Sequence, residues 1–192
     1  MKTTIIFAHP WHGSYNKAIL DQVTDKLEQL NKEYSVIDLY KEEFNPTLVE
    51  ADLKLYSQGL SSDPLVDRYI NQLKETNEVI FIFPIWWYEA PAIIKGFFDK
   101  VMLVGRMIKY NDEQTQLIPL IKIDRTTVIT TSELTDDEMR NDFGNPIEHV
   151  LFKGPMNDIG MHHPKWLNRG RINLISQEER TKFLETIYDY ID

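Results

Sequence analysis

The chain has 192 residues, a length typical of a single domain with its own apolar core. Its formal net charge of −9 argues against nucleic acid or an anionic membrane surface as the main partner, because both attract clustered lysine and arginine. The absence of cysteine excludes disulfides, thiolate nucleophiles and thiolate metal ligands, and it is typical of proteins from a reducing compartment.

The amino-terminal segment runs directly into a short apolar stretch at 4–8, which predicts the first strand. No apolar leader precedes this stretch, and no later run approaches the roughly eighteen apolar residues of a spanning helix, so we expect a cytoplasmic protein. The strand pattern stops at 9–14, and apolar residues then recur on one helical face between 16 and 30. Strand, loop and helix in this order form the first half of a βαβ unit.

Strand and helix patterns continue to alternate through the first half of the chain. The segment 33–39 predicts a second strand, and 40–63 is a long polar connection of which a part is expected to be helical. The pattern at 64–74 predicts a helix, and the continuous apolar run 79–83 predicts a strand covered on both faces. This order favours a doubly wound parallel sheet with helices on both faces.

Three large rings, Trp86, Trp87 and Tyr88, follow the central strand directly after Pro84, which ends the strand because it has no N–H to donate. Such a position, at the carboxyl end of a buried parallel strand, is where open α/β sheets bind ligands. Core packing would explain a single ring, but three adjacent rings cannot all enter one core. We therefore expect a flat stacking wall for a planar ligand.

The helix that opens at Pro91 carries apolar residues at helical spacing, and we expect Phe97 and Phe98 to be exposed. Further along, 126–131 predicts a β-branched strand, and the acidic segment 134–144 is expected to be a mobile loop. We expect an irregular excursion at 105–123 and a helix at 146–158. A short last strand within 160–168 completes a five-stranded sheet. The closing helix at 176–191 begins with a capping box of Ser176 and Glu179.

Three loops, 9–16, 84–90 and 130–133, leave the carboxyl ends of predicted strands and should converge on one crevice, because the first and third strands flank the switch point of such a sheet. The first loop predicts a phosphate site. Gly13 allows close approach of the backbone, and the Ser14 hydroxyl and the positive end of the following helix face an incoming anion. The plainer alternative is that Ser14 only caps the helix and that His9 is buried in the core.

Two stretches of the chain resemble signatures of the NAD(P)H:quinone oxidoreductase family of flavodoxin-like flavoproteins. PIWWYxxPAIIKGFFD, which starts at Pro84, is similar to the segment that lies along the flavin ring, and HPxxxSYN, which starts at His9, is similar to the flavin-phosphate loop. The resemblance implies a flavodoxin-like fold and an NAD(P)H dehydrogenase (quinone) that works by ping-pong transfer of a hydride through flavin N5. The cofactor residues it implies are His9, Ser14, Tyr15 and Asn16, then Pro84, Ile85, Trp86, Trp87 and Tyr88, then Thr130, Thr131, Ser132 and Glu133.

The third of these loops departs from the family pattern, in which two threonines precede two glycines, because Ser132 and Glu133 follow the threonines here. The segment 139–143 also departs, since it offers Phe143 where many members carry tyrosine or histidine. We expect FMN as cofactor, with FAD as the alternative because only chain length argues against it, and NADPH or NADH as hydride donor. No catalytic side chain is assigned, and no metal site is expected, because His162 and His163 lack spaced carboxylate or cysteine partners.

The resemblance also implies partners. A quinone or another flat acceptor is the expected substrate, and a homodimer with its sites at the subunit interface is the expected assembly, to which the helix after Pro91 would contribute. Two other functions remain open. One is a flavin-binding regulatory subunit of a potassium efflux transporter, and the other, disfavoured by the absence of a threonine-rich phosphate loop, is a one-electron carrier of the flavodoxin type.

Overall fold

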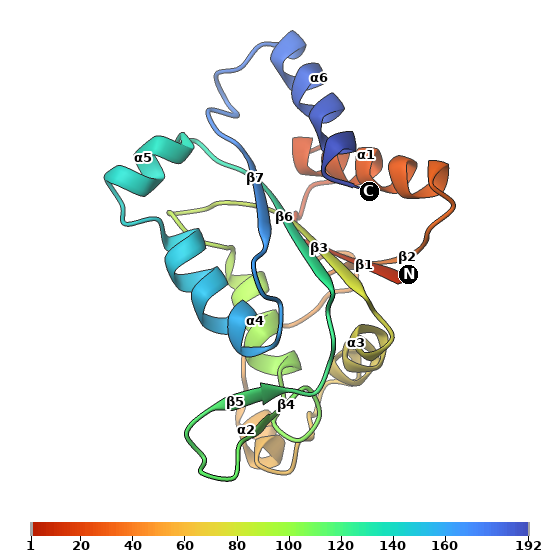
Figure 1. Ribbon diagram of the computed structural model, residues 1–192, viewed down its shortest axis with the longest axis vertical. Helices are drawn as coiled ribbons and strands as arrows, with labels where there is room; N and C mark the ends of the chain where they lie inside the picture. The colour runs from red at the N-terminus through yellow and green to blue at the C-terminus, as the bar shows by residue number, and fades with distance from the viewer. Residues whose placement is uncertain (1, 192) are drawn as a thin grey trace.

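The computed structural model describes residues 2–191, which form a five-stranded parallel sheet in the order β2-β1-β3-β6-β7 (Figure 1). This strand order is that of a doubly wound flavodoxin-like sheet, as predicted. Every residue of the central strand β3 is buried, which explains why its sequence is a continuous apolar run. The strands are β1 (Lys2–Phe7), β2 (Glu33–Asp38), β3 (Glu78–Pro84), β6 (Arg125–Thr131) and β7 (Lys165–Arg169).

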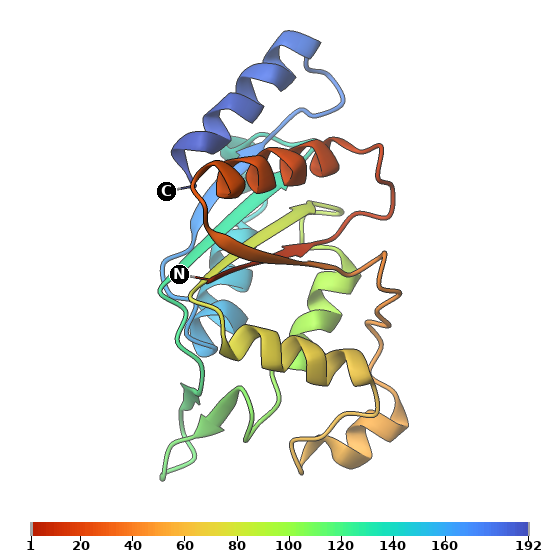
Figure 2. The same ribbon diagram turned by 90° about the vertical axis from the view of Figure 1, so that its right-hand side faces the viewer.

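Helices cover both faces of the sheet, as Figure 2 shows for α1 and α6 on one side and α3 and α4 on the other. Successive residues of β3 point to opposite faces, so Ile80 and Ile82 pack with the first pair of helices, whereas Phe81 and Phe83 pack with the second. The helices are α1 (Tyr15–Gln29), α6 (Gln177–Thr186) and the short η2 (Ile187–Asp189) on one face, and α3 (Pro64–Lys74), α4 (Ala92–Val101) and η1 (Ile147–Met156) on the other.

The expectation that Phe97 and Phe98 are exposed is wrong. Their exposed fractions are 0% and 5%, and the ring of Phe98 stacks on that of Phe81 with centroids 5.7 Å apart. Helix α4 lies between β3 and α3, so a wide part of its circumference faces apolar neighbours. A contribution of these two rings to a subunit interface is therefore excluded.

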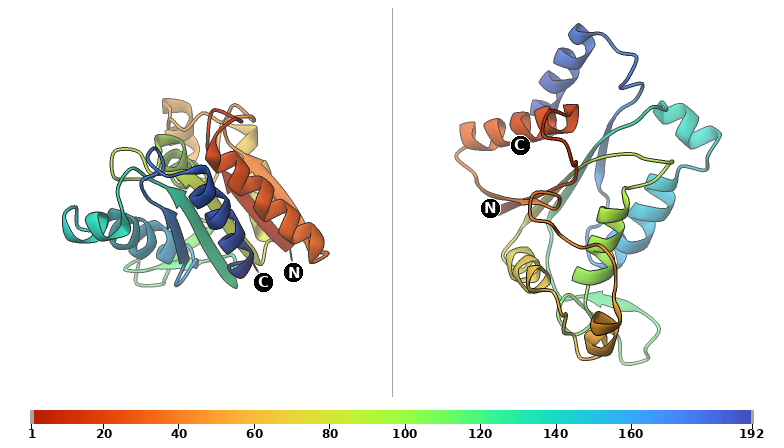
Figure 3. Two further views of the ribbon diagram at one scale, coloured as in Figure 1. Left: turned by 90° about the horizontal axis from the view of Figure 1, so that it is seen from above. Right: turned by 180° about the vertical axis from the view of Figure 1, so that it is seen from behind.

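Two segments expected to lack regular structure contain short elements. In 105–123, β4 (Ile108–Tyr110) pairs in antiparallel fashion with β5 (Leu117–Pro119), and this hairpin lies at the same end of the molecule as α2 (Glu50–Tyr56), away from α6 (Figure 3). In 134–144, α5 (Asp136–Asn141) forms because Thr135 and Glu138 make a reciprocal capping box. Within residues 2–191, no helix has the length and apolarity needed to cross a membrane.

Candidate functional site

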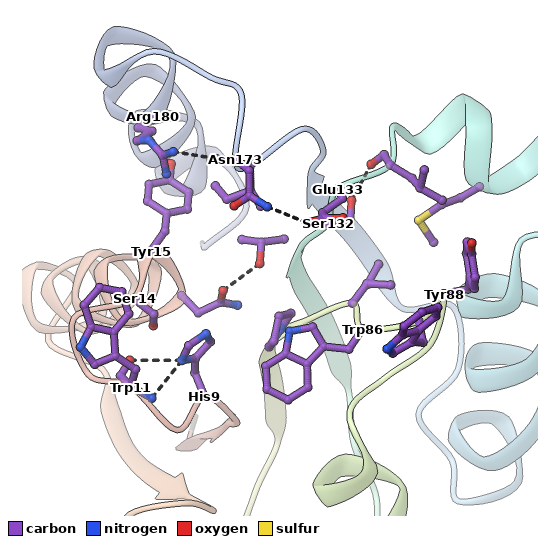
Figure 4. A pocket seen from close by; sticks show the side chains of 18 residues that line it. His9, Trp11, Ser14, Tyr15, Trp86, Tyr88, Ser132, Glu133, Asn173 and Arg180 are labelled. Carbon is purple, nitrogen blue, oxygen red and sulfur yellow. Dashed lines mark hydrogen bonds between the residues drawn. The ribbon is translucent and has the colours of Figure 1, made fainter.

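A cavity of about 630 Å³ lies at the carboxyl edge of the sheet, within the size range of small-molecule sites. The three predicted loops converge on it, and every predicted cofactor residue except Thr130 lines its wall (Figure 4). The residues that the loops bring together are His9, Ser14, Tyr15, Asn16, Pro84, Ile85, Trp86, Trp87, Tyr88, Thr131, Ser132 and Glu133.

The structure does not bring the side chain of Thr130 to the cavity. Thr130 is fully buried, its hydroxyl donates to Asn168 Oδ1 at 2.8 Å, and it accepts from Trp166 Nε1 at 2.9 Å. Neighbouring residues of a strand point to opposite faces, so Thr131 lines the cavity while Thr130 packs behind it.

Six further residues line the cavity without having been predicted from the sequence. Met139 comes from α5 and Arg180 from α6, and the others lie in loops at the same edge of the sheet. The loop after the last strand could have been found by the rule that identified the other three, because β7 is parallel to its neighbour β6 and ends at the same edge. The six residues are Trp11, Leu134, Met139, Ile172, Asn173 and Arg180.

The first loop presents hydrogen-bond donors to the cavity at the start of α1. Ser14 is the N-cap of this helix and accepts from the Lys17 amide at 3.2 Å, which leaves its own O–H free to donate. Asn16 is 3% exposed, and its Oδ1 accepts from the Thr131 hydroxyl at 2.8 Å. Its Nδ2 is buried without a hydrogen-bond partner, an arrangement that costs free energy unless a ligand supplies an acceptor.

The Trp11 ring packs over Gly13, and a Cβ atom added there would lie 2.4 Å from this exposed ring and would displace it. His9 Nδ1 lies 3.1 Å from both the amide nitrogen and the carbonyl oxygen of Trp11, so its tautomer decides whether it accepts from the amide or donates to the carbonyl. Burial lowers the pKa of His9, and the neighbouring His12 lowers it further, so the ring is neutral at pH 7. A neutral ring carries one hydrogen, so Nε2 donates to a ligand when Nδ1 accepts from the Trp11 amide and accepts when Nδ1 donates to the Trp11 carbonyl.

The three predicted rings lie on a tight two-residue turn. Backbone hydrogen bonds of 3.0 and 3.2 Å join Trp86 to Glu89, and the central residues Trp87 and Tyr88 have φ values of 50° and 74°. This left-handed pair is favourable for asparagine and glycine, and it costs large side chains on the order of 1–3 kcal/mol each. Strain of this kind persists where the surrounding structure enforces it, often at ligand sites.

The rings of this turn face outward to different degrees, which confirms that they cannot all enter the core. Trp87 is 90% exposed, and Trp86 and Tyr88 are about half as exposed. Tyr88 stacks on Phe143 with ring centroids 4.4 Å apart, and Trp86 meets the edge of the His9 ring at 6.1 Å. The turn therefore provides an aromatic wall on the side of the cavity opposite α1 and α6 (Figure 4).

Helices α1 and α6 are joined at the other side of the cavity by Tyr15 and Arg180. The Tyr15 hydroxyl donates to the Arg180 carbonyl at 2.6 Å, and burial raises the pKa of Tyr15 to about 12. The Arg180 guanidinium lies 5.5 Å from the Tyr15 ring and donates to the Ile172 carbonyl at 2.6 Å. Among the described residues that line the cavity, Arg180 is the only arginine or lysine.

The third loop is held by its own hydrogen bonds. Ser132 donates to the Leu134 carbonyl at 2.6 Å and accepts from Asn168 Nδ2 at 2.9 Å, so its side chain supports the loop. Glu133 is exposed at the rim, where its carboxylate accepts from Asn173 Nδ2 at 2.6 Å. Within residues 2–191, no group of three histidine or acidic side chains is placed to hold a metal ion.

Comparison with known proteins supports the same fold. A family profile described as flavodoxin-like fold matches residues 1–190. An uncharacterized NAD(P)H oxidoreductase of Haemophilus influenzae is 28% identical over 96% of this chain and 91% of its own length. Several further relatives match over only about half of their own length.

Two solved structures share the fold at lower identity. One is the NAD(P)H:quinone oxidoreductase from Methanothermobacter marburgensis, with a TM-score of 0.83, 22% identity and coverage of 98% of this chain and 96% of that chain. The other is an FMN-dependent NADH-azoreductase from Bacillus anthracis in complex with FMN, with a TM-score of 0.77, 19% identity and coverage of 100% and 99%. At these identities the likeness establishes the architecture alone.

Proposed function

The chain belongs to the flavodoxin-like fold family that contains NAD(P)H oxidoreductases, and we propose that it is a flavin-dependent NAD(P)H dehydrogenase that reduces quinones or similar flat acceptors. One observation carries this proposal. A single cavity combines an exposed aromatic wall with a helix N-terminus at which the buried Nδ2 of Asn16 has no partner. A flat ring system that bears a phosphate suits both features.

The residues present fit FMN. Ser14 and Asn16 would hold the phosphate end together with the backbone N–H groups at the start of α1, and the tautomer of neutral His9 that has its hydrogen on Nε2 would donate as well. Each hydrogen bond to a charged phosphate contributes roughly 1.5–3 kcal/mol, more than the roughly 0.3–1 kcal/mol of the helix terminus at ordinary exposure. The solved azoreductase of this fold contains FMN, and FAD is the alternative cofactor.

The aromatic turn would hold the ring end of the cofactor. Bound flavin supplies the hydride chemistry itself, accepting from NADPH or NADH and delivering to the acceptor, so the protein need not supply a catalytic acid or base. Trp86 and Tyr88 line one wall and exclude water from the ring. The two substrates would use the same open side in turn, as a ping-pong reaction requires.

A homodimer is part of the proposal. Trp11, Trp87 and Phe143 are 66%, 90% and 44% exposed, and all three belong to or contact the wall of the cavity. Exposed apolar rings around a binding site are typical of surfaces that a second chain covers. Light scattering coupled to size exclusion should give twice the monomer mass. A monomer would contradict this part of the proposal without affecting the flavin site.

The test is an absorbance spectrum recorded after the purified protein has been mixed with FMN or FAD and separated from the excess. Anaerobic NADPH or NADH is then added, followed by a quinone. Retained flavin that bleaches promptly with a nicotinamide and recovers with the quinone is the expected result. Retained flavin that bleaches slowly with both nicotinamides would contradict the dehydrogenase and favour a carrier or a regulatory subunit. Failure to retain either flavin would contradict the proposed site itself.

A further inference from the structure

Two side chains from different loops meet at the rim of the cavity. Glu133 follows β6 and Asn173 follows β7, and Asn173 Nδ2 donates to the Glu133 carboxylate at 2.6 Å. Both residues line the cavity, and Figure 4 shows the contact between the side of Arg180 and the side of Tyr88. We refer to this contact as the rim bridge.

The loops that carry the rim bridge are fixed to each other by the backbone. The Ser132 amide donates to the Arg169 carbonyl at 3.0 Å, and the Ile172 amide donates to the Ser132 carbonyl at 3.0 Å. Gly170 allows this close approach, because a Cβ atom there would lie 2.7 Å from the Leu134 carbonyl. The two side chains are thus presented from a rigid base, although each is exposed.

The cavity concentrates its unpaired donors at one place, the start of α1. The partnerless amide of Asn16 and the start of α1 serve one anion, and the nearest cation, Arg180, is already engaged by the Ile172 carbonyl and the Tyr15 ring. Asn173 directly follows Ile172, so the rim bridge lies next to this engaged arginine. A second phosphate there would meet the negative carboxylate of Glu133, and Arg180, the one cation among the described lining residues, already donates to the Ile172 carbonyl.

These contacts bear on which flavin the cavity accepts. A mononucleotide ends at its one phosphate, whereas a dinucleotide continues into a second phosphate and an adenosine that must pass the rim. We infer, on the basis of the proposed flavin site, that the bridge between Glu133 and Asn173 closes the rim to the adenylate half of FAD and makes the protein selective for FMN. The closed contact between the two loops and the negative charge of Glu133 both act against the adenylate half.

The test compares dissociation constants for FMN and FAD, measured by quenching of flavin fluorescence in the full-length protein. Glu133→Ala and Asn173→Ala each remove the bridge from one side, and both should lower the ratio of the FAD to the FMN constant by on the order of five- to tenfold, the range expected for one hydrogen bond. Glu133→Gln retains an oxygen that can accept from Asn173 and removes only the charge, so it should lower the ratio less than Glu133→Ala does.

Asp137→Ala is the matched control, because it removes an exposed acidic side chain of the neighbouring helix α5 that does not line the cavity. An unchanged ratio in both alanine variants, with FMN still bound, would overturn the inference and leave the proposed function intact. A ratio that falls as far in Glu133→Gln as in Glu133→Ala would assign the selectivity to charge and also overturn it. Failure of the unaltered protein to bind either flavin would overturn the proposed function together with the inference.

Discussion

Two regions at opposite ends of helix α4 differ in whether their buried polar groups have hydrogen-bond partners. Near the end of α4, Lys100 is 3% exposed, and its ammonium donates to Asp63 and to the Asn45 carbonyl, both at 2.9 Å. Asp52 lies 3.7 Å from the same ammonium and accepts from the amide and the hydroxyl of Ser62. Every group of this buried cluster is paired within the chain.

At the other end, the cavity leaves its polar groups incomplete. The Nδ2 of Asn16 has no partner, and Trp87 and Tyr88 occupy a backbone conformation unfavourable to large side chains. This chain therefore satisfies a buried cation completely where only the fold depends on it. The unsatisfied donor lies beside a cavity that a ligand can enter, and the strained turn forms the opposite wall, so both features fit a ligand site.

Removal of the cation from the paired region should have the largest effect. In Lys100→Met the carboxylates of Asp52 and Asp63 lose their buried partner, and breaking such a pair costs about 3–5 kcal/mol. Denaturant unfolding should show this loss. Lys54→Met is the control, because Lys54 makes an exposed ion pair with Glu50 and its loss should cost at most about 0.5 kcal/mol. A similarly small loss of unfolding free energy in both variants would show that the buried pairs of Lys100 stabilise the protein no more than an exposed ion pair does.

The next effect concerns the incomplete region and is expected in binding. Asn16→Asp keeps an acceptor for the Thr131 hydroxyl, but it replaces the free amide donor with negative charge. The dissociation constant for FMN should rise about 10- to 100-fold, because a hydrogen bond to phosphate is worth roughly 1.5–3 kcal/mol. Asn71→Asp introduces the same charge on the exposed face of α3 and should bind as the unaltered chain does. Equal affinities in the two variants would show that Asn16 does not face the phosphate.

Much of the fold and of the cavity can be predicted from residue types. The apolar run of β3 was recognisable because a strand buried on both faces has no polar alternation, and the convergence of three loops follows from parallel strand order. The capping box of Thr135 and Glu138 is also visible in the sequence. The acidic composition around it nevertheless favours a loop, so α5 is not predicted.

Other features depend on how elements meet in space. The apolar stripe of α4 identifies a packed face but does not define how much of the helix circumference is buried. The prediction that Phe97 and Phe98 are exposed is therefore wrong, and both rings are buried. Arg180 lies far along the chain from the first loop, and only the packing of α6 against α1 brings it to the cavity. The left-handed conformation of Trp87 contradicts local preference, so no propensity rule could have predicted it.

A smaller effect tests whether the strain of the aromatic turn is real. Trp87→Asn places a residue that tolerates φ near 50° at a position that is 90% exposed, so little packing is lost. The free energy of unfolding should rise by about 0.5–1 kcal/mol, while flavin binding should weaken because the aromatic wall is reduced. Tyr110→Asn is the control, since this exposed ring does not have a positive φ and its replacement should not stabilise the protein. A lower free energy of unfolding in Trp87→Asn would show that the ring contributes packing and that its positive φ does not destabilise the protein.

The smallest effect is the dependence of stability on pH at His9. Burial lowers the pKa of His9 in the folded protein below the ordinary value of 6.5, so the unfolded chain binds a proton more readily between these two values. Unfolding then takes up a proton, and stability must fall as pH decreases through about 6.5 toward the folded pKa. His9→Gln removes this contribution, so its unfolding free energy should decline less between pH 7 and pH 5 than that of the unaltered chain. Coincident pH profiles would mean that His9 titrates alike in both states and that burial does not keep its ring neutral in the folded protein.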